Sequence, residues 1–377
     1  MKNFILLLSV LIIAACSSGK KQFEKGNYET SVSTAVKRLK KSPGNKKASE
    51  TLRKAYPMAE KLHLTRVKQL KNSQDRFKWD QITTSYGRLN QMYDEVWRCP
   101  SCLEILPKVK NYKNEYNDAA ILAADERYDA GVEELAKETR ESAIAAYRHF
   151  QRVQDLRPNY KDTPQKLEES KYYATLKVVI DQIPVHSRTL GLSHEFFQNR
   201  LYEFVERGGF NEFVRLYSPA EANREGLDQP DHIIVMQFDD FVVGQTFFKE
   251  SSREITKDSV VVGSVEIDGE KRDVYGTAEA EYTEYSKYLD SRGLLDLKIY
   301  DGRTDRILFQ RKLSGSYQWL SEWSNYKGDK KALTKEELDR ADQREAPSPP
   351  PQFLFEQFCG PIYDQAVGHI RSFYRGY

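Results

Sequence analysis

Histidine and cysteine are scarce in this chain. Six histidines and four cysteines occur among 377 residues, and no two histidines stand four residues apart, as zinc-binding helices place them. The sequence also lacks a Gly-x-Ser-x-Gly elbow, a Walker-type loop and a dinucleotide-binding glycine pattern. These absences exclude the commonest nucleophilic, nucleotide-dependent and zinc-dependent enzymes. We therefore expect a protein that is not an enzyme and that uses no cofactor and no metal.

Two short motifs invite a catalytic interpretation but lack a required partner. His194-Glu195 begins like a zinc-protease motif, yet the position that needs the second histidine holds Gln198. Asp239-Asp240 is a pair of carboxylates without a nearby histidine, and it lies in an alternating segment that is typical of a strand. We interpret both motifs as structural.

The longest apolar run lies at the amino terminus. Lys2 precedes 12 mostly apolar residues, 4–15, which are too few to cross a bilayer core of roughly 30 Å as a helix. The run ends in Ile13-Ala14-Ala15-Cys16, which resembles the lipobox of bacterial lipoproteins. The resemblance implies a signal peptide over residues 1–15, cleavage before Cys16, and attachment of a diacylglycerol and a palmitate-type acyl chain at Cys16. The alternative is an ordinary secretory signal that ends beside a cysteine.

Residues 16–21 then form a lipidated tether. Buried acyl chains contribute about 0.8 kcal/mol per methylene, which is enough to hold a large body at a membrane without a transmembrane helix. Position 17 holds Ser17, whereas an aspartate there implies retention in the inner membrane of well-studied diderm bacteria. The resemblance thus implies a lipid anchor in the outer membrane, with the body facing the periplasm rather than the exterior.

The positive charge of the chain is concentrated near this anchor. Residues 17–76 carry 16 Lys and Arg against 5 Asp and Glu, although the formal net charge of the whole chain is only +2. Such a basic stretch can contact anionic lipid head groups. The alternative is a solvated helix face without a ligand. We expect no nucleic-acid partner.

Residues 22–174 show apolar residues at helical spacing. Gly26-Asn27-Tyr28, with Ala35, Leu39 and Pro43, resembles the second helix of a tetratricopeptide repeat, in which a proline ends the helix 17 residues after the glycine. A second such helix ends at Pro158. Because the two prolines are 115 residues apart, which is not a multiple of the roughly 34-residue repeat, the repeats are degenerate. The resemblance implies an array of antiparallel helices with a protein-binding surface.

Three cysteines remain after the signal. Cys99 and Cys102 form a Cys-x-x-Cys that follows a predicted helix, and Cys359 stands alone in an aromatic segment. A disulfide in the helix-helix turn suits an oxidising periplasm. Free thiols, a zinc site and a redox centre are the alternatives for the pair. Cys359 is predicted to be a small buried hydrophobe.

Residues 175–345 change to strand-like patterns. Leu295 to Tyr300 alternate between apolar and polar, as in a half-buried antiparallel strand, and further strands are predicted at 232–248, 258–267, 272–288, 293–300 and 306–313. A Pro-rich linker and aromatic segment at 346–360 precede a helix at 361–377, opened by Pro361, that packs on the sheet. The predicted fold class is multidomain α and α+β, with a TPR-like antiparallel helical array followed by an α/β sandwich whose sheet is mainly antiparallel.

Parts of this second half resemble a known group of lipoproteins. Asp231 with its apolar strand, and the segment from Leu297 through Asp301-Gly302 to Leu308, are similar to the periplasmic α/β domain of curli-secretion-type lipoproteins and of lipoprotein activators of penicillin-binding proteins. The chain as a whole resembles uncharacterised lipoproteins of Bacteroidota-type bacteria. The insertion at 245–288 is longer than in the curli-type pattern, so pore formation and synthase activation do not carry over.

Aromatic residues gather in residues 317–326, where Tyr317, Trp319, Trp323 and Tyr326 occur. Tryptophan and tyrosine are common in binding hot spots and can also stack on sugars. Core packing, a partner surface and glycan stacking are the three interpretations.

These observations predict a membrane-anchored periplasmic lipoprotein that acts as a protein-interaction scaffold or adaptor in envelope assembly or export. Its partners are envelope proteins, and it reaches the membrane through the lipid anchor. A glycan- or peptidoglycan-binding lipoprotein is the first alternative, and a degenerate redox or hydrolytic enzyme is the second.

Overall fold

The computed structural model describes residues 19–181, 195–207, 211–267 and 269–377. The chain divides into two compact units between Ala174 and Thr175. In the described residues, no helix has both the length and the apolar character needed to cross a membrane. The first unit is helical, and the second combines helices with a five-stranded sheet that is mostly antiparallel. The mixed α and α+β class predicted from the sequence is confirmed at this level.

The first unit is an array in which each long helix packs on the next one along the chain. Its helices are α2 (Lys20–Glu24), α3 (Tyr28–Lys41), α4 (Lys46–Lys71), α5 (Lys78–Trp97), α6 (Pro100–Ile105), α7 (Lys113–Leu135), α8 (Arg140–Leu156) and α9 (Thr163–Ala174).

Small residues allow close packing in this array. On α7 they form most of the buried surface, namely Ala119, Ala120, Ala123, Ala124, Ala130 and Gly131. A Cβ added at Gly131 would lie 2.7 Å from the ring of Phe150 on α8, which is closer than any carbon contact allows. α7 contacts both α5 and α8, and its small buried residues allow both neighbouring helices to approach closely.

One buried charge cluster joins three of these helices. Asp80 on α5 accepts two hydrogen bonds from Arg127 on α7, at 2.7 and 2.9 Å, and two from Arg152 on α8, at 2.6 and 2.9 Å. The side chain of Asp80 is only 11% exposed. Burial acts to raise the pKa of this carboxyl, but the hydrogen bonds and charges of Arg152 and Arg127 outweigh it and hold the pKa below its usual value. Asp80 is therefore a charged link within the array.

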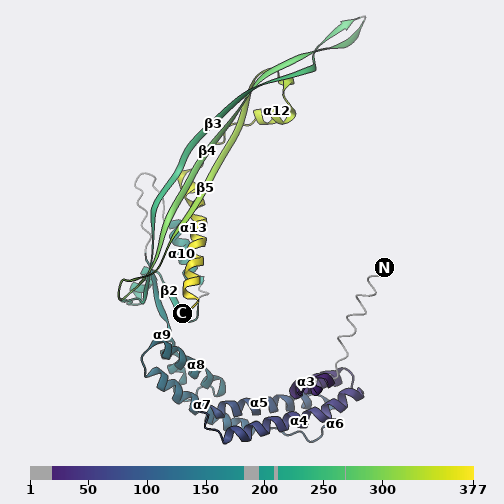
Figure 1. The fold of residues 1–377 in the computed structure, drawn as a ribbon, viewed down its shortest axis with the longest axis vertical. Helices are drawn as coiled ribbons and strands as arrows, with labels where there is room; N and C mark the ends of the chain where they lie inside the picture. The colour runs from purple at the N-terminus through teal and green to yellow at the C-terminus, as the bar shows by residue number, and fades with distance from the viewer. Residues whose placement is uncertain (1–18, 182–194, 208–210, 268) are drawn as a thin grey trace. The chain divides into compact units, whose positions relative to one another are not determined.

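The sheet of the second unit has the strand order β2-β1-β3-β4-β5. Its strands are β1 (Leu176–Ile180), β2 (Val214–Tyr217), β3 (His232–Ile267), β4 (Glu270–Asp301) and β5 (Ile307–Gly328). The helices of this unit are α10 (Glu195–Arg207), α11 (Pro219–Arg224), the 3-10 helix η1 (Lys330–Ala332), α12 (Lys335–Ala341) and α13 (Pro351–Tyr374). β1 pairs in parallel with β2 and β3, whereas β3, β4 and β5 pair antiparallel. Figure 1 shows β3, β4 and β5 as one long, twisted ribbon of strands.

β3 and β4 are much longer than predicted. The segments predicted separately at 232–248 and 258–267 form one strand, and those at 272–288 and 293–300 form another. The register between them shifts at four places, and each shift puts an extra residue in β3. Gly244 and Ser259 take positive φ values of 70° and 59° at two of these bulges. Bulges increase local twist, so these two strands coil without breaking.

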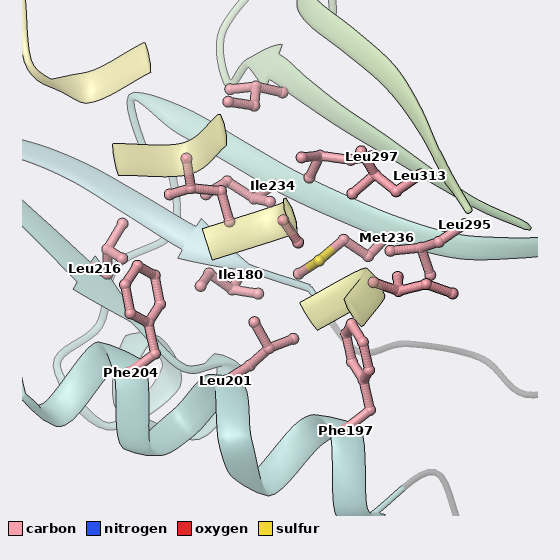
Figure 2. Packing of buried hydrophobic residues seen from close by; sticks show 14 of the residues in the cluster. Ile180, Phe197, Leu201, Phe204, Leu216, Ile234, Met236, Leu295, Leu297 and Leu313 are labelled. Carbon is pink, nitrogen blue, oxygen red and sulfur yellow. The ribbon is translucent and has the colours of Figure 1, made fainter. Parts of the chain in front are cut away.

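The core of the second unit lies between the sheet and two helices, α10 and α13. Figure 2 shows Phe197, Leu201 and Phe204 of α10 pointing toward strand residues such as Ile180 and Ile234. α13 adds a buried stripe that consists of Leu354, Phe355, Phe358, Cys359, Ile362, Ala366, Ile370 and Tyr374. Burial raises the pKa of the Cys359 thiol, and this residue is a small buried hydrophobe as predicted.

Two predictions about the carboxyl terminus are wrong. The final helix begins at Pro351 and not at Pro361, so most of the predicted linker at 346–360 is helical. Pro361 lies inside the helix, where a proline removes one hydrogen bond and costs about 3 kcal/mol. The stripe from Leu354 to Tyr374 is buried on both sides of this proline. Packing of that stripe on the sheet outweighs the cost, because a fully buried Leu or Phe contributes about 1.5–3 kcal/mol.

Asp231 connects β1 with the turn between β4 and β5. Its carboxylate accepts a hydrogen bond from the backbone N–H of Lys177 at 2.8 Å, and its carbonyl accepts one from Gly302 at 2.8 Å. A Cβ at Gly302 would lie 2.0 Å from the carbonyl oxygen of Pro230. Asp301 accepts from the N–H groups of Arg303 and Thr304. These residues fix where β1, β3 and the β4–β5 turn meet, and they have a structural role.

Candidate functional site

The outer end of the β3–β4 hairpin extends beyond the rest of the sheet (Figure 1). β5 ends at Gly328, which is paired with Ala280 of β4. A Cβ at Gly328 would lie 2.5 Å from the carbonyl oxygen of Glu279. Residues 257–267 and 270–279 therefore form a two-stranded hairpin that no third strand supports within the described chain. We call these residues the arm tip.

The arm tip exposes apolar side chains on both faces. Val265, Ile267 and Val274 share one face by register and are 46%, 44% and 42% exposed. Val261 and Tyr275 are paired on the other face and are 38% and 64% exposed. Monomeric proteins rarely expose contiguous apolar patches unless a partner covers them. The arm tip has the composition of a contact surface.

The same hairpin has open backbone edges. β1 pairs with β3 only as far as Ile234, and beyond that point this edge of β3 has no strand partner in the part of the chain that the structure describes. On the other side, β4 has no outer strand partner over residues 270–278 within the described residues, and the carbonyl of Glu279 accepts a hydrogen bond from the N–H of Asp329. An open edge presents N–H and C=O groups that a strand of another molecule can pair with. Lys249, Arg253 and Lys257 on β3 are charges of the kind that limits unspecific pairing at such an edge.

A row of aromatic rings crosses the ribbon below the arm tip, with one ring from each strand. Tyr285 of β4 and Trp323 of β5 stack at 5.4 Å between centroids with an angle of 16°. Phe248 of β3 lies 5.9 Å from Trp323 and 6.0 Å from Tyr285, and it is 57% exposed. Phe248 is exposed and the other two rings are half-buried, and cross-strand pairing brings the three rings together.

The four aromatic residues singled out from the sequence do not form one surface. Tyr317 packs edge-on against Phe353 of α13. Trp319 lies opposite Leu289, and Trp323 joins the aromatic row. Tyr326 lies on the other face of β5, where it packs against a buried cluster around Tyr282. The structure thus leaves Trp323 in a partly exposed row and puts Tyr317 and Tyr326 against the cores.

Ion pairs fix α12 against the face of the ribbon opposite this row. Glu337 pairs with Arg253 of β3 at 2.7 Å, and Arg340 pairs with Glu284 of β4 at 3.4 Å. A backbone hydrogen bond from Thr334 lowers the pKa of Glu337. A polar cavity of about 300 Å³ lies here, and its lining includes Trp323, Glu284 and Arg340. Because adjacent residues of a strand point to opposite faces, the rings of Tyr285 and Trp323 lie on the face of the ribbon opposite Glu284 and Arg340.

The cysteine pair is a buried disulfide. The Sγ atoms of Cys99 and Cys102 lie 2.10 Å apart, and both residues are fully buried. Cys99 is the N-cap of α6, so the bond closes the turn between α5 and α6. Thiol exchange requires an accessible sulfur atom. Both cysteines of this disulfide are fully buried in the first unit, so neither sulfur atom is accessible to a thiol.

The remaining candidate residues show no shared chemistry. Within residues 19–181, 195–207, 211–267 and 269–377, no group of three or more His, Cys, Asp or Glu side chains is placed to hold a metal. Cys16 and His194 lie outside the described residues. Asp239 forms an ion pair with Lys312 at 2.7 Å, and the strand register shifts between Phe238 and Asp240.

Comparisons with known proteins give no family. No family model and no curated protein matches this chain. Among solved structures, the chain is similar to the hypothetical protein CT253 from Chlamydia trachomatis, with a TM-score of 0.26, 9% identity, and coverage of 54% of this chain and 100% of that one. It is also similar to a putative neuraminyllactose-binding hemagglutinin homolog from Helicobacter pylori, with a TM-score of 0.24, 11% identity, and coverage of 52% and 84%. At these TM-scores neither similarity bears on fold or function.

Proposed function

We propose that this protein is a lipid-anchored periplasmic scaffold in the outer membrane, and that the arm tip binds a protein partner in envelope assembly or export. The exposed apolar side chains of the arm tip carry the proposal. A two-stranded hairpin is marginally stable alone in water. A partner that covers Val265, Ile267 and Val274 removes their apolar surface from water and stabilises the hairpin.

Strand addition is the binding mode that fits this hairpin. A partner strand that pairs with the open edge of β3 gains main-chain hydrogen bonds, and the alternate side chains of the arm tip supply specificity. The aromatic row at Phe248, Tyr285 and Trp323 lies on the other face of the ribbon, the face that Tyr275 shares.

The helical unit supplies a second surface of TPR-like character. A groove of about 660 Å³ is lined by residues of α3, α5 and α7, among them Lys40, Asn90, Arg98 and Asn117. Most of its lining residues carry polar groups, which suits an extended peptide whose backbone needs hydrogen-bond partners. The antiparallel, serial packing of the helices and the repeat-like segment from Gly26 to Pro43 favour degenerate TPR-like repeats.

The anchor is tested by changing the lipidated residue. A Cys16→Ser variant is expected to lose lipidation and to leave the outer-membrane fraction, because no helix in the described chain can replace the anchor. Fractionation of cells with quantitative immunoblotting measures this. A Cys359→Ser variant is the matched control and should stay with the membrane. If the Cys16→Ser variant fractionates like the wild type, the proposal of a lipid anchor at Cys16 is wrong.

The scaffold itself is tested by purification from detergent-solubilised membranes. The wild type is expected to elute with a defined protein partner at a constant ratio across independent preparations. Elution as the chain alone, at concentrations where the membrane complex is intact, contradicts a scaffold.

A glycan-binding lipoprotein is the second candidate, and the aromatic row of Phe248, Tyr285 and Trp323 favours it, because aromatic rings stack on sugars. Retention on isolated peptidoglycan that Trp323→Ala abolishes supports this function. Retention that is unchanged in this variant contradicts it.

A further inference from the structure

The folded body begins very close to the proposed anchor. Gly19 is buried, and its carbonyl oxygen accepts a hydrogen bond from the hydroxyl of Ser31 on α3 at 3.0 Å. Gly19 has a φ of 82°, and a Cβ there would lie 2.6 Å from the carbonyl oxygen of Ser31. From Cys16 to Gly19 the chain takes three steps, which span at most about 11 Å. A lipid on Cys16 therefore holds the first helices near the head groups.

The anchored end lies beside α4. Helix α2, which follows Gly19, contacts both α3 and α4. At the start of α3, a carboxylate oxygen of Glu29 lies 3.0 Å from Nε2 of His63 on α4. The second half of α4 is thus the part of that helix nearest to the start of α3.

The exposed face of α4 is strongly basic. It carries eight exposed Lys and Arg residues against Glu50 and Glu60, namely Lys46, Lys47, Arg53, Lys54, Lys61, Arg66, Lys68 and Lys71. None of the eight forms an ion pair within the described part of the chain, although several surface cations elsewhere do. Three apolar residues are exposed among them, since Met58, Leu62 and Leu64 are 43%, 53% and 37% exposed. A basic helix face with exposed apolar side chains is typical of membrane-surface helices.

We propose that the exposed face of α4, around Lys54, Lys61, Leu62 and Arg66, lies on the anionic lipid surface in which the protein is anchored. The proposal rests on the lipid anchor at Cys16. Lys and Arg side chains near an anionic surface are attracted to its head groups, and Met58 and Leu62 are positioned to enter the head-group region. The short tether favours lipid over an acidic protein, because it holds the start of the folded body, which packs beside α4, within about 11 Å of the anchor. The contact adds a second membrane signal to the acyl chains.

A probe on α4 tests this contact in purified protein. The lipidated full chain with Leu62→Cys is labelled with an environment-sensitive fluorophore. The label is selective because Cys99 and Cys102 are paired and Cys359 is buried. The protein is reconstituted in vesicles of phosphatidylcholine alone or mixed with phosphatidylglycerol. We expect a blue shift and quenching by head-group-labelled lipid only in the anionic vesicles, and loss of both at high salt.

Charge reversal provides the matched comparison. Lys54→Glu, Lys61→Glu, Arg66→Glu and Lys68→Glu together should abolish the quenching. The control carries the same change at four exposed lysines of the second unit, Lys257, Lys271, Lys327 and Lys330, and should retain it. Equal signals in both vesicle types, or no effect of reversal on α4, overturn the proposal. Failure of the protein to float with neutral vesicles refutes the anchor itself, which is a separate outcome.

Discussion

Replacing Asp80 with alanine is expected to destabilise the helical unit by about 3 kcal/mol, because it leaves two arginines facing each other without a counter-charge. Arg127 and Arg152 donate four hydrogen bonds to this carboxylate from two different helices. Their side chains are 23% and 37% exposed, so water partly solvates the two unpaired arginines. The loss of stability therefore stays at the lower end of the range for breaking a buried ion pair. Local unfolding is measured by hydrogen exchange of peptides from α5, α7 and α8 in increasing urea.

A surface pair in the same unit is the control for this substitution. Glu133 pairs with Arg76 at 2.6 Å, and both side chains are more than half exposed. Glu133→Ala should change the free energy of unfolding by less than about 1 kcal/mol. If Asp80→Ala and Glu133→Ala have equal effects, the cluster does not hold the array together.

The same cluster gives the helical unit a dependence on pH. The folded pKa of Asp80 is held below its usual value of about 4, so the unfolded chain binds this proton at a higher pH than the folded one. The stabilisation is present above about pH 4 and is lost as the pH falls through the folded pKa. The wild type should lose more stability than Asp80→Ala on acidification in this range.

Removing the apolar surface of the arm tip is expected to weaken partner binding roughly a hundredfold, which is about 3 kcal/mol. The change is Val265→Thr, Ile267→Thr and Val274→Thr in one chain. Threonine keeps the β-branched shape that strands prefer, but it buries a hydroxyl at the contact and removes a methyl, at about 1 kcal/mol or more for each residue. Titration of the purified partner, identified from solubilised membranes, measures the dissociation constant.

The control for the arm tip carries three threonines at polar positions of the same hairpin. The changes are Ser264→Thr on β3, and Lys271→Thr and Asp273→Thr on β4. Together they leave the net charge unchanged and retain the exposed valines. This control should bind like the wild type. Equal weakening in both variants means that hairpin stability, and not the apolar face, determines binding.

The helices were predictable because their apolar spacing is local. Val32, Ala35, Val36 and Leu39 mark one buried face of α3 in the sequence itself. The link from Asp80 to Arg127 and Arg152 was not predictable, since it joins residues 47 and 72 positions apart. A charged residue within a helical sequence pattern normally predicts a solvent-exposed position. Only the tertiary packing shows that Asp80 is buried.

The long hairpin was missed for a related reason. The polar segment at 249–257 separates the two strands predicted at 232–248 and 258–267, because a strand is recognised in a sequence by one apolar face. In the structure this segment is exposed on both faces for most of its length, so no apolar alternation is required. The aromatic row was also missed, since Phe248, Tyr285 and Trp323 meet only through the strand register. The paired Phe247-Phe248 within a strand pattern was the one available signal.

Photo-crosslinking from the arm tip tests the central claim most directly. A photoreactive amino acid is placed at position 265 of the wild-type lipoprotein in living cells, and a second strain carries it at the exposed position of Glu141 on α8. The account predicts a discrete protein adduct from position 265 in the outer-membrane fraction, and none of that mass from position 141. No adduct from position 265, or the same adduct from both positions, would contradict the claim that the arm tip is a partner-binding surface.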